Sequence, residues 1–221
     1  MTPAAVIFDF DGVILESADI KTQAFLELFA DYPEHRQAIL DHHLENVGVS
    51  RYRKFEWIHS ELLRIPLDED HSKHLGNAFS DIALGKILAC PFVPGALECL
   101  ESLRHRTRLF VASGTPQEEL DLIVDRRDLR RFFTGVYGTP RTKVEIIRTL
   151  MADYGFGRDR TVFIGDGLSD YQAAMETGLR FIARASPSGG VDWTALGVTA
   201  VPDLHGMVSL IDSGEVARIP A

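Results

Sequence analysis

The stretch Val6-Ile7-Phe8-Asp9-Phe10-Asp11-Gly12-Val13 decides the fold and points to the chemistry. Its apolar start predicts a buried strand, and two carboxylates and a glycine follow. Buried carboxylates are costly unless a cation or hydrogen bonds compensate them. A bound Mg²⁺, with a covalent role for one carboxylate, is one explanation, because ligand sites in open α/β sheets lie at the carboxyl ends of strands. Asp and Gly are also ordinary turn residues, so this stretch alone leaves a simple turn open.

The second half of the chain alternates between predicted strands and helices. Strands are predicted at 109–112, 133–137, 161–164 and 180–183. Helices are predicted at about 94–105, 143–154 and 169–177, and another is expected to begin after Thr115, with Thr115, Pro116 and Glu118 forming a capping box. This alternation indicates an α/β fold with a doubly wound, Rossmann-like parallel sheet.

A helical segment interrupts this pattern directly after the first strand. Between about residues 16 and 89 the apolar residues recur at helical spacing, and no Val/Ile-rich strand intervenes. We therefore expect a core of residues 1–16 and 90–221, and an inserted helical cap of about four helices at 17–89. After residue 186 we expect a Ser/Gly/Pro-rich loop and a last helix at 204–211.

Composition excludes several classes of partner. The formal net charge of the 221 residues is −9, which argues against binding nucleic acid or anionic membranes. Cys90 and Cys99 form neither a metal-ligand spacing nor a disulfide framework, so we expect reduced thiols. Since no leader-like segment opens the chain and no apolar run could span a bilayer, we expect a soluble, cytoplasmic protein. We take a monomer as the default oligomeric state.

Four positions combine reactive side chains with strand ends or helix starts. They are Asp9 and Asp11, then Ser113-Gly114-Thr115, then Lys143 at the start of a helix, and finally Gly165-Asp166-Gly167-Leu168-Ser169-Asp170. Each has an ordinary alternative: a loop serine, a solvated lysine or a tight turn.

Taken together, in this order, the four positions resemble the motifs of the haloacid dehalogenase-like hydrolase superfamily. The resemblance covers nearly the whole chain, including the place where the cap is inserted. That superfamily is largely phosphatases, and its members with two aspartates in the first motif act on phosphoryl groups. The dehalogenase branch lacks the second aspartate, so Asp11 favours phosphoryl transfer. The resemblance implies a Mg²⁺-dependent phosphatase that hydrolyses a small phosphomonoester through an aspartyl-phosphate.

The resemblance also implies a role for each carboxylate. Asp9 attacks phosphorus, and Asp11 protonates the leaving oxygen and then deprotonates water. Asp9, Asp166 and the backbone carbonyl of Asp11 are expected to hold Mg²⁺, which prefers oxygen ligands. Asp170 is expected to be a further ligand or to support the others.

The phosphoryl oxygens are expected to be held by Ser113, Thr115 and Lys143, helped by backbone N–H groups near Gly12 and Gly114. Arg141 competes with Lys143 for the role of the third motif's cation. Many relatives carry a Lys-Pro pair there, whereas this chain has Thr139-Pro140-Arg141-Thr142-Lys143. Lys143 is preferred because the superfamily also uses a lysine that opens this helix.

The cap is expected to choose the substrate by closing over the site. Its Gly48-Val49-Ser50-Arg51 is similar to the cap substrate loop of the β-phosphoglucomutase branch. By that likeness Arg51 binds a phosphate or carboxylate of the substrate, although a solvated helix-end charge is the alternative. With His42, His43 and Lys54 nearby, this polar cap suits a phosphosugar or a small phosphorylated acid.

Two other functions remain open. A phosphosugar mutase would need a histidine about ten residues beyond the second aspartate, where this chain has Lys21, which could still bind phosphate. A catalytically idle regulator that binds metal or phosphate would have no need of a general acid such as Asp11. A cap lysine acting as a Schiff base, as in the phosphonatases of the superfamily, is disfavoured by Asp11.

Overall fold

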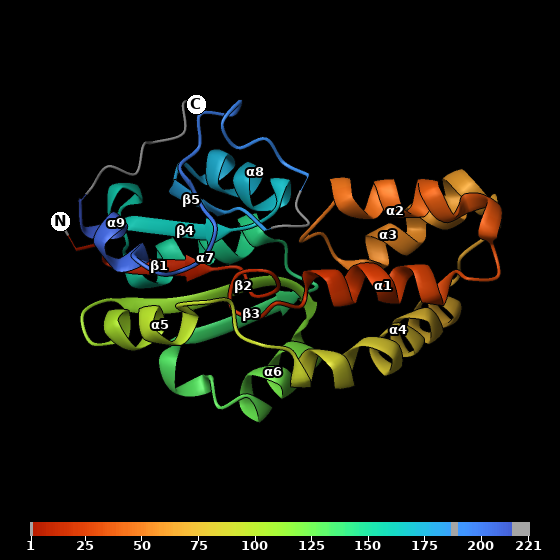
Figure 1. Ribbon diagram of the computed structural model, residues 1–221, viewed down its shortest axis with the longest axis horizontal. Coiled ribbons are helices and arrows are strands. Elements are labelled where there is room, and N and C mark those ends of the chain that lie inside the picture. Colours follow the sequence, from red (N-terminus) through yellow and green to blue (C-terminus); the bar gives the residue numbers. More distant parts are fainter. Residues whose placement is uncertain (1, 187–189, 214–221) are drawn as a thin grey trace.

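A parallel six-stranded sheet forms the centre of the molecule (Figure 1). The computed structural model describes residues 2–186 and 190–213. The strands are β1 (Ala5–Phe8), β2 (Arg108–Pro116), β3 (Gly135–Thr139), β4 (Thr161–Gly165), β5 (Arg180–Arg184) and β6 (Ala200–Val201). Their order is β3-β2-β1-β4-β5-β6. The chain therefore adds β2 and β3 on one side of β1, and then β4, β5 and β6 on its other side. This doubly wound arrangement confirms the predicted fold class and places a crevice at the carboxyl ends of β1 and β4.

Helices cover both faces of the sheet. These α-helices, which come after the inserted helical segment, are α5 (Ala96–Arg104), α6 (Gln117–Arg126), α7 (Lys143–Tyr154), α8 (Leu168–Thr177) and α9 (Met207–Ser213). Alternate residues of β1 point to opposite faces: Val6 and Phe8 pack in one apolar cluster with α5, α6 and α9, while Ala5 and Ile7 pack in the other with α7 and α8. The central strands are therefore apolar on both sides, as their continuous apolar sequences predict.

Between β1 and α5 the described chain is helical. The elements are α1 (Ala18–Leu28), a 3-10 turn (Pro33–His35), α2 (Arg36–Glu45), α3 (Arg51–Trp57), a π-helical turn (Ile58–Leu63) and α4 (Glu69–Ala89). These helices lie together beyond one end of the sheet (Figure 1), around buried Phe25, Phe55 and Phe79. We refer to α1–α4 as the cap; the boundaries at residues 16–17 and 89–90 stay a prediction.

The structure corrects two local expectations. Thr115 does not cap a helix, because β2 continues through Pro116, and Pro116 occupies the N-cap position of α6 without a side-chain cap. The Thr115 hydroxyl instead donates a hydrogen bond to Asp11 and accepts one from Lys21, as described below. The two-residue strand β6 falls in a segment that was expected to be loop; of that predicted loop, residues 187–189 lie outside the described residues, as do residues 214–221 of the predicted core.

The structure also bears on the state of the cysteines and on the presence of membrane-spanning helices. Cys90 and Cys99 are both free thiols and both are buried. Within residues 2–186 and 190–213, no helix combines the length and the apolar character needed to span a membrane.

Candidate active site

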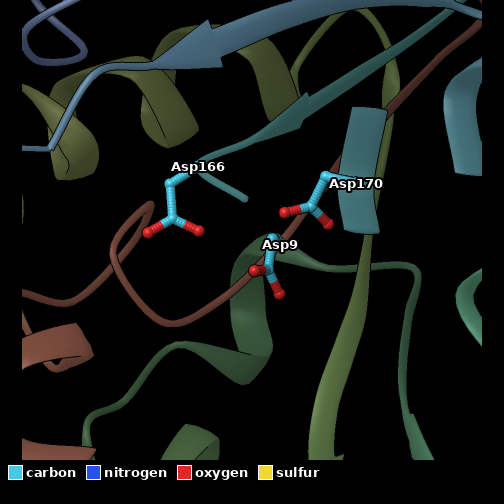
Figure 2. A group of neighbouring side chains, drawn as sticks. All are labelled: Asp9, Asp166 and Asp170. Carbon is cyan, nitrogen blue, oxygen red and sulfur yellow. The ribbon is translucent and has the colours of Figure 1, made fainter. Parts of the chain in front are cut away.

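Three aspartates meet at the carboxyl ends of β1 and β4. Asp9 follows β1, Asp166 follows β4, and Asp170 lies in the first turn of α8 (Figure 2). All three are buried, and one carboxylate oxygen from each lies within 4.8 Å of the others. Among the described residues, the Oδ1 atoms of Asp9 and Asp166 are buried without a hydrogen-bond partner. Unsatisfied buried carboxylate oxygens that converge in this way are suited to a hard divalent cation.

The electrostatics of the cluster agree with this arrangement. Burial, followed by repulsion from Asp170, raises the pKa of Asp9 to about 7, although the Lys143 ammonium opposes the rise. Burial and the neighbouring charges of Asp9 and Asp170 likewise raise the pKa of Asp166 well above its ordinary value. The protein therefore pays a free-energy cost to keep both groups ionised, and a bound cation would remove that cost.

Lys143 is the cation that contacts this cluster. Its helix begins at a capping box in which Thr142 and Glu145 exchange hydrogen bonds, and this fixes where Lys143 lies. The Lys143 Nζ lies 2.5 Å from Asp170 Oδ1 and 3.2 Å from Asp9 Oδ2. Burial would lower the pKa of Lys143, but Asp170 and Asp9 outweigh it and raise that pKa, so the ammonium stays charged. Arg141 instead lies over the ring of Tyr137, 4.8 Å from its centre.

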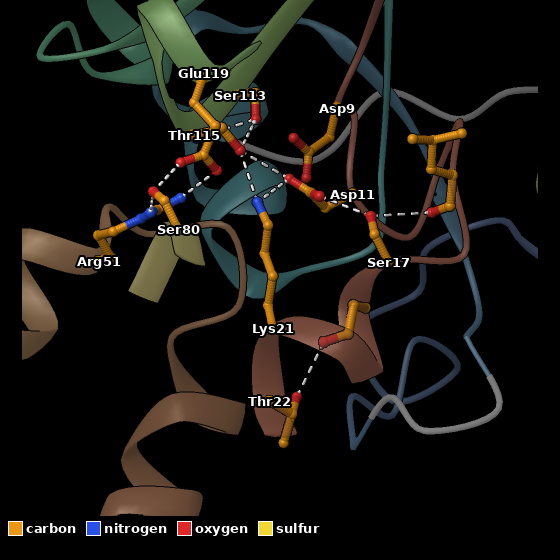
Figure 3. Close-up of polar contacts among 12 residues, drawn as sticks. Asp9, Asp11, Ser17, Lys21, Thr22, Arg51, Ser80, Ser113, Thr115 and Glu119 are labelled. Carbon is orange, nitrogen blue, oxygen red and sulfur yellow. Dashed lines mark hydrogen bonds and ion pairs between the residues drawn. The ribbon is translucent and has the colours of Figure 1, made fainter. Parts of the chain in front are cut away.

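The carboxylate of Asp11 belongs to a different set of contacts. It accepts hydrogen bonds from Ser17 Oγ at 2.6 Å, from Thr115 Oγ1 at 2.9 Å and from the ammonium of Lys21 (Figure 3). Burial would raise the pKa of Asp11, but the charge of Lys21 and these hydrogen bonds outweigh it and lower the pKa. The Asp11 side chain is thus held ionised beside, and not within, the group of three aspartates.

Ser113, Gly114 and Thr115 form the last part of β2, beside Asp11. The Ser113 Oγ accepts a hydrogen bond from the backbone N–H of Thr115 at 3.1 Å, and Lys21 Nζ donates to Thr115 Oγ1 at 2.6 Å. Ser113 therefore orients Thr115, and Thr115 links β2 to both Asp11 and the cap helix α1.

Two glycines allow the backbone to approach the carboxylates and the cap. Gly12 has a φ of 76°, and a Cβ there would lie 2.0 Å from Asp166 Oδ2. A Cβ on Gly114 would lie 2.4 Å from the carbonyl oxygen of Gly48. The cap loop that contains Gly48 is also held by Ser169, whose Oγ donates a hydrogen bond to the carbonyl oxygen of Val47 at 2.7 Å. Residues 47–49 of the cap thus rest directly on the core at the site.

Arg51 is buried, and the protein itself binds its guanidinium. Arg51 Nη2 lies 2.5 Å from Glu119 Oε1 on α6, and Nη1 donates to Ser80 Oγ at 2.8 Å (Figure 3). The Glu119 carboxylate also accepts a hydrogen bond from Ser80. Arg51 therefore joins the cap to the core here, and its predicted role as a substrate ligand stays a prediction.

A cavity of about 70 Å³ lies between the cap and the strand ends. Its core side includes Asp9, Asp11 and Asp166, and its cap side includes Lys21, Phe25, His43, Arg51, Lys54 and Phe79. A partly enclosed space with largely apolar walls and a few convergent polar groups is the usual form of a small-molecule site.

Three contacts of the site escaped sequence reasoning. Nothing in the sequence distinguishes Ser17 from the other serines, and Gly48 carried no sign that its carbonyl would meet Gly114. Glu119 is an ordinary acidic residue in the first turn of a helix, and its partner Arg51 is 68 positions away. Only an observation of paired sequence changes could have linked such residues.

The comparisons with known proteins agree with this architecture. Residues 6–184 match the family model described as haloacid dehalogenase-like hydrolase. The chain belongs to this family. It is therefore an enzyme of the hydrolase class, and the resemblance inferred from the four sequence positions is confirmed.

Solved structures share the fold over nearly the full length of this haloacid dehalogenase-like hydrolase. A protein from Clostridium acetobutylicum described as a predicted phosphatase is 20% identical, with a TM-score of 0.74, and the match covers 96% of this chain and 100% of that one. A predicted phosphoglycolate phosphatase from Haemophilus somnus 129pt is 17% identical, with a TM-score of 0.69 and coverage of 95% and 98%.

A protein from Thermotoga maritima described as a "putative beta-phosphoglucomutase" is 19% identical, with a TM-score of 0.67 and coverage of 96% and 99%. At these identities the likeness establishes the fold alone. No curated protein sequence matches the chain.

Proposed function

We propose that this hydrolase is a Mg²⁺-dependent phosphatase that acts on a small phosphomonoester through an aspartyl-phosphate. The observation that carries the proposal is the convergence of Asp9, Asp166 and Asp170, with two unpartnered carboxylate oxygens, beside the ammonium of Lys143. Phosphoryl transfer needs in-line positioning and neutralisation of charge more than any other assistance, and this set of side chains supplies both.

In the first step an Asp9 carboxylate oxygen attacks phosphorus, and the bond from phosphorus to the ester oxygen breaks. Lys143, 3.2 Å from Asp9, neutralises part of the charge on the phosphoryl oxygens. Ser113, with N–H groups near Gly12 and Gly114, holds the same oxygens, while Thr115, whose hydroxyl donates to Asp11, takes part through Asp11. In the second step a water oxygen attacks phosphorus, which releases phosphate and restores Asp9.

Asp11 handles the protons in both steps. It gives a proton to the leaving ester oxygen and then takes one from the attacking water. The lowered pKa of Asp11 suits the second role. For the first role, the negative charge of an incoming phosphate raises the pKa of Asp11 and favours its protonated form.

The residues present fit a divalent metal, because their ligand atoms are hard oxygens and two of the carboxylate oxygens have no hydrogen-bond partner among the described residues. Asp9, Asp166 and the backbone carbonyl of Asp11 would hold Mg²⁺, which supplies charge neutralisation to the phosphoryl group. Both oxygens of Asp170 already accept hydrogen bonds, one from Lys143 at 2.5 Å and one from the Gly167 N–H at 3.1 Å. We therefore assign Asp170 to the support of Lys143.

Release of inorganic phosphate from a panel of small phosphomonoesters, in Mg²⁺ and in EDTA, tests the proposal. We expect release in Mg²⁺ from at least one ester, and none in EDTA. If no ester releases phosphate, but a phosphosugar is isomerised when a sugar bisphosphate is added, the enzyme is a mutase and the proposal is wrong. An absence of both activities would favour an idle binding protein.

Replacing Lys21 with methionine is expected to change the pH dependence of turnover. Lys21 lowers the pKa of Asp11, so Asp11 is ionised from low pH upward in the wild type. Without the ammonium this pKa rises, so kcat should fall more at pH 5.5 than at pH 8. The pH profile of kcat for Lys21→Met measures this, with Lys86→Met, at an exposed cap lysine, as the control; parallel profiles for Lys21→Met and the wild type would contradict it.

A further inference from the structure

Lys54 is a buried cation in the active-site cavity that the proposed mechanism does not use. It lies on α3, three residues after Arg51, and its exposed fraction is 3%. It lines the same cavity as Asp9 and Asp166. Within the described part of the chain Lys54 makes two hydrogen bonds, both to His43, and no ion pair.

The contacts with His43 fix the ammonium in place. Lys54 Nζ lies 3.1 Å from His43 Nδ1 and 3.3 Å from the His43 carbonyl oxygen, and it lies 5.3 Å from the centre of the Phe25 ring. Burial and the charge of Lys54 lower the pKa of His43 to about 2, so its imidazole is neutral and Nδ1 accepts. An ammonium has three N–H donors, so one remains for a ligand.

Among the described residues, no carboxylate forms an ion pair with Lys54. A buried ammonium is costly unless an anion pairs with it. Arg51, the other buried cation of α3, already has its anion, since Glu119 lies 2.5 Å away. An anionic group on the substrate would give Lys54 the partner that the described residues do not provide.

The single remaining donor of Lys54 limits what that anion is. A carboxylate carries one negative charge and matches one ammonium N–H. A second phosphoryl group carries about two negative charges and three acceptor oxygens, most of which one donor would leave unsatisfied. A small carboxylic acid therefore suits Lys54 better than the second phosphate of a phosphosugar does.

We propose that Lys54 is a specificity-determining residue that binds the carboxylate of a small phosphorylated carboxylic acid while the phosphoryl group lies at Asp9. This inference rests on the proposed phosphatase function and narrows its substrate class. His43 positions Lys54, and Arg51 joins the cap to α6.

The test compares phosphoglycolate with ethyl phosphate, which share a two-carbon chain on phosphate and differ in the carboxylate. For Lys54→Gln we expect kcat/KM for phosphoglycolate to fall about 10- to 100-fold, the effect of losing one hydrogen bond between charged groups. The kcat/KM for ethyl phosphate should stay within about threefold, since that substrate has no carboxylate to lose. Lys73→Gln, at an exposed cap lysine, should behave as the wild type with both. Equal losses on both substrates for Lys54→Gln, or no loss on phosphoglycolate, would overturn the proposal.

A second measurement uses only the wild-type enzyme, so it does not depend on whether a variant folds. Burial, then Lys21 and Lys143, lower the pKa of Lys54 to about 7, against the opposing charge of Asp166. The titratable groups facing Lys54 are Lys21 on α1, His42 and His43 on α2, Lys143 on α7 and Asp166 after β4. Because Lys54 loses its charge as the pH rises through about 7, the wild-type preference for phosphoglycolate over ethyl phosphate should fall above that pH. A preference that stays constant from pH 6 to pH 9 would contradict the role of Lys54.

Binding separates this inference from the proposed function. Calorimetry of phosphoglycolate and ethyl phosphate with Asp9→Asn, with and without Lys54→Gln, measures recognition without turnover. If the wild type hydrolyses no ester of the panel but phosphoglycolate binding depends on Lys54, the phosphatase proposal fails and Lys54 remains a carboxylate-binding residue. If the wild type hydrolyses other esters and shows no preference for a carboxylate, the inference fails and the phosphatase proposal stands.

Discussion

Replacement of Asp9 with asparagine is expected to reduce kcat by about 10⁴-fold or more, in the range found when a nucleophile is removed from an enzyme. The amide is nearly isosteric but does not form the covalent bond to phosphorus. The fold should survive, because asparagine removes a carboxylate that burial and Asp170 already disfavour in its charged form. The measurement is phosphate release in Mg²⁺ together with the circular dichroism spectrum.

The matched control is Asp31→Asn, which makes the same substitution at an exposed residue of the cap. It should retain wild-type activity. An Asp9→Asn enzyme that is folded and retains more than a few per cent of the wild-type kcat would remove Asp9 from its assigned role. The mechanism would then need another nucleophile, or direct attack by water.

Replacement of Asp166 with asparagine is expected to abolish the stabilisation of the protein by Mg²⁺. A ligand present at 100 times its Kd stabilises a protein by about 2.7 kcal/mol, which raises Tm by roughly 5–10 °C for a chain of this size. The wild type should show such a rise, and Asp166→Asn should not. Its kcat should fall at least about 100-fold, since the phosphoryl charge loses a neutralising partner.

In EDTA the order of stabilities should reverse. The folded state raises the pKa of Asp166 through burial and the charges of Asp9 and Asp170. Such a group stabilises the fold while it is protonated, and this contribution is lost as the pH rises toward the raised pKa. At pH 8 without metal, the wild type therefore bears a cost that Asp166→Asn avoids, so the variant should have the higher Tm. A variant that is less stable than the wild type in EDTA and still responds to Mg²⁺ would refute the assigned metal site.

The sheet could be predicted from the sequence because its signals are local. The apolar runs before Asp9 and before Gly165 form β1 and β4. Helix α7 begins at Lys143, as predicted, where the Thr142–Glu145 capping box fixes its first turn. These elements follow from patterns within a few residues, and tertiary contacts reinforce them.

The remainder depends on contacts between distant residues. Thr115 had the local signature of a helix cap, yet its hydroxyl bonds to Asp11, 104 positions away, so β2 continues past it. Arg51 was expected to bind the substrate, which stays a prediction, but nothing in the sequence indicated that the carboxylate of Glu119 would lie beside it. The proposed role of Lys54 rests on its burial without a carboxylate partner among the described residues. A short stretch of sequence does not show which side chains the fold will place around it.

The most direct test of the central claim is a search for the phosphoryl group on Asp9 during turnover. The enzyme is mixed with a phosphomonoester that it hydrolyses, in Mg²⁺, quenched with acid within one turnover, and its peptides are analysed by mass spectrometry. The account predicts that the peptide containing Asp9 gains one phosphoryl group, and that this species forms and decays as fast as phosphate is released. Phosphate release with no phosphoryl group on Asp9, or with one on another residue, would contradict the account.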